Sequence, residues 1–262
     1  RIAAEVEWFL HDVADCRRTV RADEVLAALG GGSALPSGGR VSIEPGGQLE
    51  VSTPPFTSVD ALCDAIDDDE VALGRRLQRC GLVLRAAGFD GQRPPVRSVS
   101  SPRYDQMEAW FLAHCPEGAE MMCSTASLQV NVDFVGDPRA SFARAVELAG
   151  DLAATYNDAP RRMAAWRAID AARGARVPTC AAAWDDYVLD TAVFADARGR
   201  TLRQLGDVGD DVVARHVSTL FPPVRPRGYL EIRTIDAQPA STRRAVIADV
   251  WSRLRRNEPN GA

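Results

Sequence analysis

The sequence predicts an α+β protein with a largely antiparallel sheet, one polar face of which lines a cavity while helices cover the other. Strand-like and helical segments follow one another without the regular alternation that builds a parallel sheet, and the chain has no Gly-x-Gly-x-x-Gly motif. Four strand-like segments alternate apolar residues with carboxylates or amides, which sets a polar row along one face. No linker divides the chain, so we expect a single domain over residues 1–262.

The most informative segment is residues 127–134, which read Ser-Leu-Gln-Val-Asn-Val-Asp-Phe. Its apolar residues stand two apart, which is the period of a strand with one face in a core. The other face carries Gln129, Asn131 and Asp133 rather than the Lys, Arg or Thr that usually cover a solvated strand. Taken alone, this pattern leaves two alternatives open: an exposed antiparallel face or the lining of a polar site.

Three further segments repeat the pattern with acids. Residues 5–8, Glu-Val-Glu-Trp, direct two carboxylates the same way, roughly 7 Å apart. Residues 42–51 form two short runs joined by Pro-Gly-Gly, and residues 229–235 place a Glu and an Arg on one face. The carboxylates and the amide that these segments add are Glu5, Glu7, Glu44, Gln48, Glu50 and Glu231.

Each of these segments alone fits a solvated strand face or a surface ion pair, which stabilises a protein little. If the strands share one sheet, however, about five carboxylates converge, and such a cluster is unfavourable unless a cation lies within it. Oxygen ligands without His or Cys suit Mg²⁺ or Mn²⁺, commonly together with the phosphates of a nucleotide. The coincidence of four such strands therefore predicts a metal–nucleotide site.

Helical spacing and cap residues predict the helices that connect these strands. Ser58 can cap a helix over 57–80, whose last turn is rich in Arg. Residues 82–86 predict a buried strand, whereas the Pro-rich stretch 219–227 predicts a stiff connection. The remaining helices are expected over 23–29, ending at the glycines 30–32, and over 101–114, 139–156, 162–173 and 241–256.

Composition narrows the partners and the compartment. The net charge of −5 and the isoelectric point near 5.3 argue against nucleic acid as a principal partner. The chain has neither an apolar run of eighteen residues nor a visible signal peptide, so we expect a cytoplasmic protein without a membrane segment. The six cysteines lack Cys-x-x-Cys spacing and predict buried, reduced thiols. Because the chain starts without Met, we expect an N-terminal stretch and some loops to be missing from it.

Six sequence elements follow one another between residue 1 and about residue 239. They are Glu5-Val6-Glu7-Trp8, Glu44-Pro45-Gly46-Gly47-Gln48-Leu49-Glu50, Arg103-Tyr104-Asp105-Gln106-Met107, the stretch Met121–Asp133, Arg162-x3-Trp166-x3-Asp170-x2-Arg173, and Leu220-Phe221-Pro222-Pro223 through Tyr229-Leu230-Glu231-Ile232-Arg233. As an ordered set they resemble the plant-type and actinobacterial branch of the glutamate–cysteine ligases, most closely its ergothioneine-pathway (EgtA-type) members.

This resemblance implies a glutamine-synthetase-like catalytic fold, in which a curved antiparallel sheet forms an acid-lined funnel with helices outside. It implies an enzyme that uses ATP and Mg²⁺, or Mn²⁺, to join the γ-carboxylate of glutamate to the amine of cysteine. The products would be γ-glutamylcysteine, ADP and phosphate, made for ergothioneine biosynthesis. The expected partners are these small molecules, without nucleic acid or membrane.

The resemblance also gives roles to individual residues. Arg233 is expected to meet the transferred phosphoryl group, because a planar guanidinium fork matches the oxygens on which charge develops. For Arg162 an ion pair on a helix surface stays open as the alternative. The expected roles are catalysis by Arg233 and Glu231, cofactor binding by Gln129, Asn131 and Arg233, substrate binding by Arg162 and Arg173, and metal binding by Glu5, Glu7, Glu44, Glu50 and Glu231.

The chain is shorter than the family pattern at three places: between Asn157 and Arg162, around residues 204–210, and after Gln238-Pro239. True deletions and segments missing from the sequence both fit these gaps. Two alternatives therefore stand beside the glutamate–cysteine ligase. One is a related carboxylate–amine ligase that uses another amine, and the other is a non-catalytic relative that binds nucleotide or glutamate.

Overall fold

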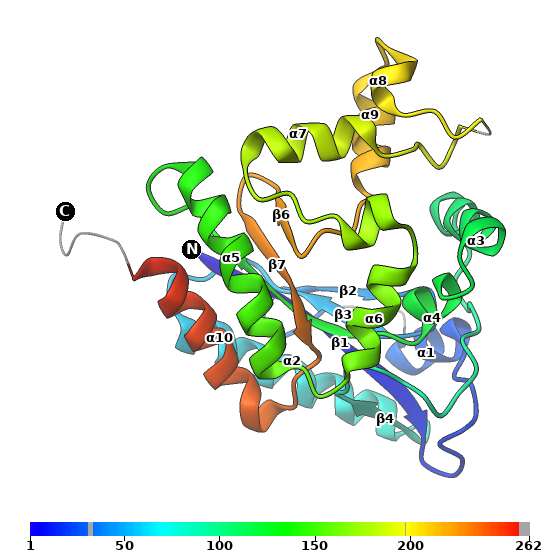
Figure 1. Ribbon diagram of the computed structural model, residues 1–262. Helices are drawn as coiled ribbons and strands as arrows, with labels where there is room; N and C mark the ends of the chain where they lie inside the picture. The colour runs from blue at the N-terminus through cyan, green and yellow to red at the C-terminus, as the bar shows by residue number, and fades with distance from the viewer. Residues whose placement is uncertain (31–33, 197, 257–262) are drawn as a thin grey trace.

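The computed structural model describes residues 1–30, 34–196 and 198–256, and its centre is an antiparallel sheet (Figure 1). The strands follow the order β2–β3–β1–β5–β7–β6, and β4 pairs with the C-terminal part of β1. Every pairing is antiparallel, which confirms the predicted class. The strands are β1 Ile2–Asp12, β2 Arg40–Ile43, β3 Leu49–Ser52, β4 Leu82–Arg85, β5 Ser127–Val132, β6 Val224–Pro226 and β7 Leu230–Asp236.

Strand β1 separates the two faces of the sheet. Ala4, Val6 and Trp8 are buried in the core, whereas Glu5 and Glu7 alternate with them and lie on the other face. Strands β5 and β7 pair with each other, and their side chains also alternate between the two faces of the sheet. The polar residues that the sequence places on separate strands therefore share one face of one sheet.

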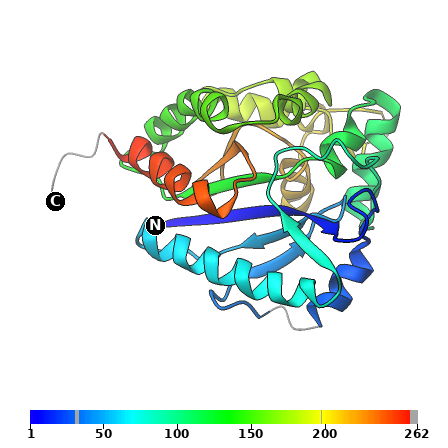
Figure 2. The ribbon, with the colours of Figure 1, turned by 90° about the horizontal axis from the view of Figure 1, so that it is seen from below.

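Three long helices cover the apolar face: α2 Val59–Gln78, α5 Pro138–Tyr156 and α10 Ala240–Arg255. Helix α10 lies between α2 and α5 and contacts both, as Figures 1 and 2 show. Ser58 caps α2 by accepting a hydrogen bond from the backbone N–H of Ala61, as the sequence predicts. Burial of the apolar stripes of these helices against the sheet builds the main core.

Shorter helices surround one end of the polar face. Helices α3, α4 and α6 pack on one another around a second core that contains Met107, Phe111, Met121 and Phe221. These elements supply the apolar end of the cavity described below. The helices outside the main core are α1 Ala22–Leu29, α3 Pro102–His114, α4 Gly118–Cys123, α6 Pro160–Ala168, the π-helical turn η1 Ala171–Ala175, α7 Ala181–Asp190, α8 Leu202–Leu205 and α9 Asp210–Val217.

Two segments differ from their predicted structure. Within 219–227, expected as a connection, residues 224–226 form the edge strand β6, because a proline is tolerated on an edge where its missing N–H is not needed. The helix expected over 162–173 ends at Ala168. Asp170 then has an extended backbone and caps η1 by accepting a hydrogen bond from the N–H of Ala172.

Smaller corrections concern burial and helix ends. The expectation of buried thiols is wrong for Cys16, Cys80 and Cys180, which are exposed. Of the predicted buried strand at 82–86, only Leu82 is buried in β4, which runs along the outside of β1. Helix α1 ends at Gly30, whose φ of 70° is left-handed; the other glycines predicted to stop it lie outside the described residues.

Candidate active site

A cavity of about 450 Å³ lies over the polar face of the sheet. Strands β1, β2, β3, β5, β6 and β7 contribute residues to it, as do the turn between β2 and β3 and helices α3, α4 and α6. Four glutamates come from β1, β3 and the turn after β2, and three arginines come from the β6–β7 side, at the other end of the sheet order. Two further arginines, Arg40 of β2 and Arg103 of α3, lie beside the acids. The cavity thus has an acidic wall, with two arginines beside it, and a basic wall.

Four glutamates form what we call the acid wall: Glu5, Glu7, Glu44 and Glu50. Glu7 of β1 and Glu50 of β3 stand directly opposite each other in the antiparallel pairing, so both side chains leave the same face at close range. Like charges in this position are destabilising unless a cation or a proton neutralises them. The structure therefore gathers the four acids that the sequence places on two separate segments.

Gly46 brings the β2–β3 turn onto the sheet. A Cβ at this position would lie 2.2 Å from the carbonyl oxygen of Cys123, so the close approach requires glycine. Gln48 then donates from Nε2 to the carbonyl oxygen of Thr125 over 2.8 Å, which ties the turn to the start of β5. The Pro-Gly-Gly segment therefore completes the acid wall by placing Glu44 over the cavity.

The pKa values of the acid wall are raised. Burial, reinforced by the negative charge of Glu50, raises the pKa of Glu44 to about 8 and that of Glu5 to about 7. Burial also raises the pKa values of Glu7 and Glu50. For all four carboxyl groups burial outweighs the nearby arginines, and ionisable groups perturbed in this way are enriched at functional sites.

Hydrogen bonds fix two of these carboxylates. The backbone N–H of Ser127 donates to Glu7 Oε2 over 2.7 Å, and the Ser127 hydroxyl donates to Oε1 over 3.0 Å. Gln129 adds a bond from Nε2 to Glu7 Oε1 over 3.1 Å. On the opposite strand pair, the Ser42 hydroxyl donates to Glu50 Oε1 over 2.7 Å. The strand β5 that the sequence singles out thus orients Glu7.

Three arginines form what we call the arginine wall: Arg225 and Arg227 at the edge strand β6, and Arg233 on β7. The fully buried Glu231 lies among them. Arg225 donates to Glu231 from Nε over 2.5 Å and from Nη2 over 3.0 Å, while Arg227 and Arg233 lie 3.4 Å and 3.6 Å from its carboxylate. Burial acts to raise the pKa of Glu231, but the three arginines together lower it, so this carboxylate stays ionised.

Arg233 extends from β7 toward Trp166. Its Nε donates to Gln129 Oε1 over 3.2 Å, and its guanidinium lies 5.3 Å from the centre of the Trp166 ring. Burial and the like charge of Arg225 lower its pKa to about 10, which leaves it charged at neutral pH. Its Nη1 is buried and finds no hydrogen-bond partner among the described residues. A charged donor without a partner can meet an oxyanion.

The predicted cofactor residues separate into two places. Gln129 lies in the cavity between the two walls, whereas Asn131 lines a neighbouring cavity of about 390 Å³. The two cavities share Glu5, Arg40, Ser52 and Arg227, so they adjoin each other on the sheet. The neighbouring cavity also contains Tyr229, an aromatic ring near cationic side chains.

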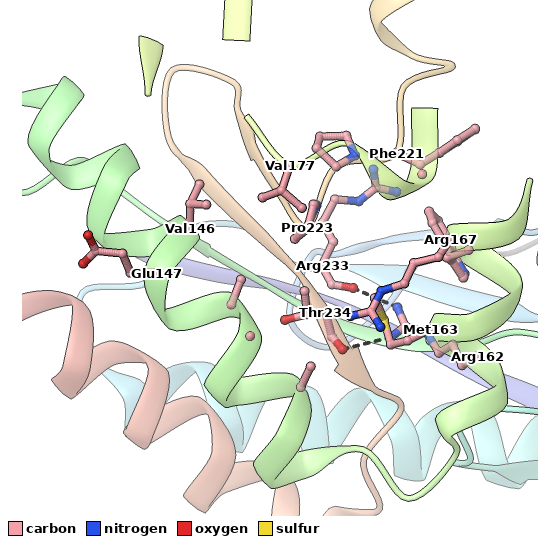
Figure 3. A pocket seen from close by; sticks show the side chains of 16 residues that line it. Val146, Glu147, Arg162, Met163, Arg167, Val177, Phe221, Pro223, Arg233 and Thr234 are labelled. Carbon is pink, nitrogen blue, oxygen red and sulfur yellow. Dashed lines mark hydrogen bonds between the residues drawn. The ribbon is translucent and has the colours of Figure 1, made fainter. Parts of the chain in front are cut away.

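The predicted substrate arginines line neither of these two cavities, but Arg162 lines a third cavity, of about 200 Å³, together with Trp166, Phe221 and Arg233. Arg162 is 2% exposed and donates to carbonyl oxygens of β7, as Figure 3 shows from the side of helix α6. The alternative of a surface ion pair is therefore wrong, because the guanidinium is buried. Arg173 is also fully buried and donates to both oxygens of Thr219.

Several residues of the cavity were not predicted. Arg225 and Arg227 stand two apart just before Glu231, but their stretch contains prolines and is therefore interpreted as a connection. Reading that stretch as an edge strand would have placed both on one face. Arg103 and Tyr104 line the cavity from α3, and Tyr104 lies 3.5 Å from Glu44 Oε2. Both lie in Arg103-Tyr104-Asp105-Gln106-Met107, one of the six ordered elements, but that segment by itself assigned neither of them a role.

The acid wall fits a hard divalent cation through its chemistry. Its candidate ligand atoms are carboxylate oxygens; burial and mutual repulsion raise the pKa values of Glu5 and Glu44, and a bound cation would offset that repulsion. In the part of the chain that the structure describes, no three His, Cys, Asp or Glu residues converge closely enough to hold a metal by themselves. Mg²⁺ usually takes one or two carboxylates and completes its shell with water and phosphate oxygens, so this arrangement suits a metal that arrives with a phosphorylated ligand.

The fold and the site together define a protein that can hold a cation and a phosphate-bearing ligand between an acid wall and an arginine wall. Residues 1–260 match the profile of Glutamate-cysteine ligase family 2 (GCS2), and the chain belongs to this family. The family resemblance predicted from the six ordered elements is therefore confirmed.

Named relatives agree with this assignment. The chain is 33% identical over 278 residues to the glutamate–cysteine ligase EgtA of Mycolicibacterium smegmatis, covering 91% of this chain and 65% of the relative. It is 34% identical to EgtA of Mycobacterium tuberculosis, covering 94% of this chain and 66% of the relative. The chloroplastic glutamate–cysteine ligase of Arabidopsis thaliana is 25% identical over 76% of this chain and 46% of the relative. The chain thus spans 65–66% of the length of the mycobacterial relatives.

A solved structure shares the fold. The glutamate–cysteine ligase GshA of Francisella tularensis, in complex with AMP, superposes with a TM-score of 0.59 over 100% of this chain and 67% of that chain. The sequences are 12% identical, so the likeness concerns the fold, and it confirms the fold that the resemblance implies. Within residues 1–30, 34–196 and 198–256, no helix has the length and apolar character needed to cross a membrane.

Proposed function

We propose that this protein joins the γ-carboxylate of glutamate to the amine of cysteine at the expense of ATP, giving γ-glutamylcysteine, ADP and phosphate. The observation that carries the proposal is the acid wall that faces the arginine wall across one cavity. Family membership supplies the substrates, and the relatives named EgtA favour the ergothioneine pathway. We place the reaction in the cytoplasm.

The chemistry explains why both walls are needed. A carboxylate does not react with an amine, so one of its oxygens must first attack the γ-phosphorus of ATP while the bond to ADP breaks. The resulting γ-glutamyl phosphate is attacked by the cysteine nitrogen, which loses a proton as phosphate leaves. Phosphoryl transfer depends mainly on alignment and on neutralising the charge of its oxygens, which cations and metals provide.

We assign metal binding to Glu5, Glu7, Glu44 and Glu50, with Glu231 as a further ligand that must exchange part of its contact with Arg225. Bound there, Mg²⁺ or Mn²⁺ would neutralise phosphate charge and act as a Lewis acid. Ser127 and Ser42 would keep the Glu7 and Glu50 carboxylates aimed at the cavity through the bonds described above.

We assign the phosphoryl oxygens to Arg233, whose Nη1 lacks a partner in the described chain, and to Arg225 and Arg227 beside it. Gln129 links the two walls because it donates to Glu7 and accepts from Arg233. The neighbouring cavity with Asn131 and Tyr229 then offers the nucleotide room beyond the phosphates.

The amino-acid substrates fit the opposite end of the cavity. Met121, Met122, Trp166 and Phe221 line that end and give a soft apolar surface suited to a thiol side chain. Arg103 is the cation there, and its buried Nε has no partner among the described residues, so we assign it to a substrate carboxylate.

The deciding experiment measures ADP release by the full-length protein with ATP, Mg²⁺ and glutamate, with and without cysteine, followed by mass detection of the product. Cysteine-dependent ADP release together with the mass of γ-glutamylcysteine is the expected result. Turnover with another amine from a panel, but not with cysteine, would replace the substrate. Nucleotide binding without turnover on any amine would refute the ligase.

A further inference from the structure

Phe221 lines the end of the main cavity that we assign to the amino-acid substrates, which we call the amino-acid end. Its ring also lines the third cavity (Figure 3) and meets the Trp166 ring edge-on, with 5.3 Å between the ring centres. Its backbone belongs to no helix or strand, because α9 ends at Val217 and β6 begins at Val224. Contacts other than those of regular secondary structure must therefore hold Phe221 in place.

One tyrosine hydroxyl binds the backbone of this segment. Pro222 and Pro223 have no backbone N–H, so the N–H of Phe221 is the last backbone donor before β6. This N–H donates to the hydroxyl oxygen of Tyr187, on α7, over 3.2 Å. The same hydroxyl donates to the carbonyl oxygen of Arg173, in η1, over 2.5 Å. A single oxygen atom thus joins the Phe221 segment to both α7 and η1.

Arg173 binds the same segment two residues earlier. Its Nη1 donates to the carbonyl oxygen of Thr219 over 3.3 Å and to the hydroxyl oxygen of Thr219 over 3.2 Å. Its Nε donates to Asp170 Oδ2 over 3.1 Å, and its guanidinium lies 3.6 Å from the centre of the Phe194 ring. Tyr187 and Arg173 are both 0% exposed, so bulk solvent does not compete for these bonds. The segment before β6 is therefore fixed from one side by two buried residues.

We propose that Tyr187 is a positioning residue for the amino-acid end: its hydroxyl fixes the backbone of Phe221, and the Phe221 ring then sets the width of that end. Tyr187 is fully buried, so it acts on the substrate through Phe221. Removing its hydroxyl leaves a buried N–H and a buried carbonyl oxygen without this partner, which favours their movement toward others. The Phe221 ring is then free to move away from Trp166, and the amino acids bind less tightly.

This inference rests on the proposed function for its kinetic test. Tyr187→Phe should raise the KM for cysteine or for glutamate by roughly three- to tenfold, which is the contribution of about one hydrogen bond to an equilibrium constant. The values of kcat and of the KM for ATP should change by less than about twofold. A merely structural role predicts a different result, because a smaller folded fraction lowers kcat and leaves every KM as it is. Unchanged KM values for both amino acids would refute the positioning role.

Tyr156→Phe is the matched control, because it removes the same hydroxyl at a distance from the cavity. Tyr156 donates to Asp249 Oδ2 over 2.9 Å and so joins α5 to α10 on the covered face of the sheet. This variant should keep every KM of the wild type. An equal rise of the same KM in both variants would contradict a role that is specific to Tyr187.

A double-mutant cycle tests whether Tyr187 acts through Phe221. If it does, the double variant Tyr187→Phe/Phe221→Leu should have the same KM values as Phe221→Leu alone, within about twofold; independent roles would multiply the two effects. Circular dichroism and thermal melting report whether each variant folds. If Tyr187→Phe does not fold, Thr219→Val replaces it, because this variant loses the hydroxyl that Arg173 binds. It should again raise the KM for an amino acid, and wild-type KM values would refute the proposal.

Crystal structures of the Tyr187→Phe and Tyr156→Phe variants give a readout that needs no activity. We expect the ring centres of Phe221 and Trp166 to stay 5.3 Å apart in the control and to move apart in Tyr187→Phe. If the two rings keep their wild-type contact in Tyr187→Phe, the positioning role is refuted. A wild-type protein that makes no γ-glutamylcysteine would refute the proposed function and leave this structural comparison decisive for Tyr187.

Discussion

The charge of Glu231 and that of Glu5 should have opposite effects on stability, although both side chains belong to the polar face of the same sheet. Glu231 is fully buried with the guanidiniums of Arg225, Arg227 and Arg233 at 2.5 Å, 3.4 Å and 3.6 Å. Glu231→Gln leaves these three positive charges without their shared anion. Removing one partner of a buried ion pair costs about 3–5 kcal/mol, and a domain has about 5–15 kcal/mol in total.

We therefore expect Glu231→Gln to lower the free energy of unfolding by about 3–5 kcal/mol. Glu5→Gln is the matched control, because burial, Glu50 and Glu231 raise the pKa of Glu5, and no ion pair reaches its carboxylate in the described residues. Neutralising Glu5 removes a disfavoured charge, so this variant should be at least as stable as the wild type in the absence of divalent cations.

Urea denaturation at neutral pH, with a chelator present, measures both variants against the wild type. The slope of the free energy with urea should stay constant, which shows that the change lies in stability rather than in the unfolded state. Wild-type stability in Glu231→Gln, or an equal loss in both variants, would show that the arginine wall does not depend on Glu231.

Three further predictions concern other parts of the molecule. Arg233→Lys should lower ADP turnover at least tenfold, because an ammonium cannot reproduce the planar fork; normal steady-state kinetics would make this arginine structural. Gly46→Ala should cost about 1–3 kcal/mol in a urea titration, because its Cβ would meet the Cys123 carbonyl oxygen at 2.2 Å, whereas Gly150→Ala, where a Cβ meets nothing within 4 Å, should not. Burial lowers the pKa of His216 to about 4 in the folded protein. As the pH falls below 6.5, the unfolded chain therefore binds a proton that the folded protein does not bind, and the free energy of unfolding should fall by about 3 kcal/mol between pH 7 and pH 4. His216→Leu should lose correspondingly less over that range; parallel urea curves for the two proteins would contradict this.

The sequence by itself determined the polar face of the sheet. Alternation of apolar and polar residues depends only on the geometry of an extended backbone, so Glu5 and Glu7 could be assigned to one face of their strand, and Gln129 to the polar face of its own, before the strands were paired. The Pro-Gly-Gly segment likewise predicted the turn that carries Glu44, because a turn depends on the residues within it. The long helices could also be predicted, because helical spacing and cap residues are local features of the sequence.

Only the tertiary structure decided which arginine side chains belong to the site. Arg225 lies in a proline-containing stretch without local strand signals, and its place beside Glu231 results from edge pairing with β7. Arg162 occurs in a motif that the sequence connects with the substrate, and only the fold shows that it also donates to backbone carbonyls of β7 beyond the end of β6. Local sequence reports the direction of a side chain along its own element, whereas its partner depends on where other elements end, and that is settled by long-range packing.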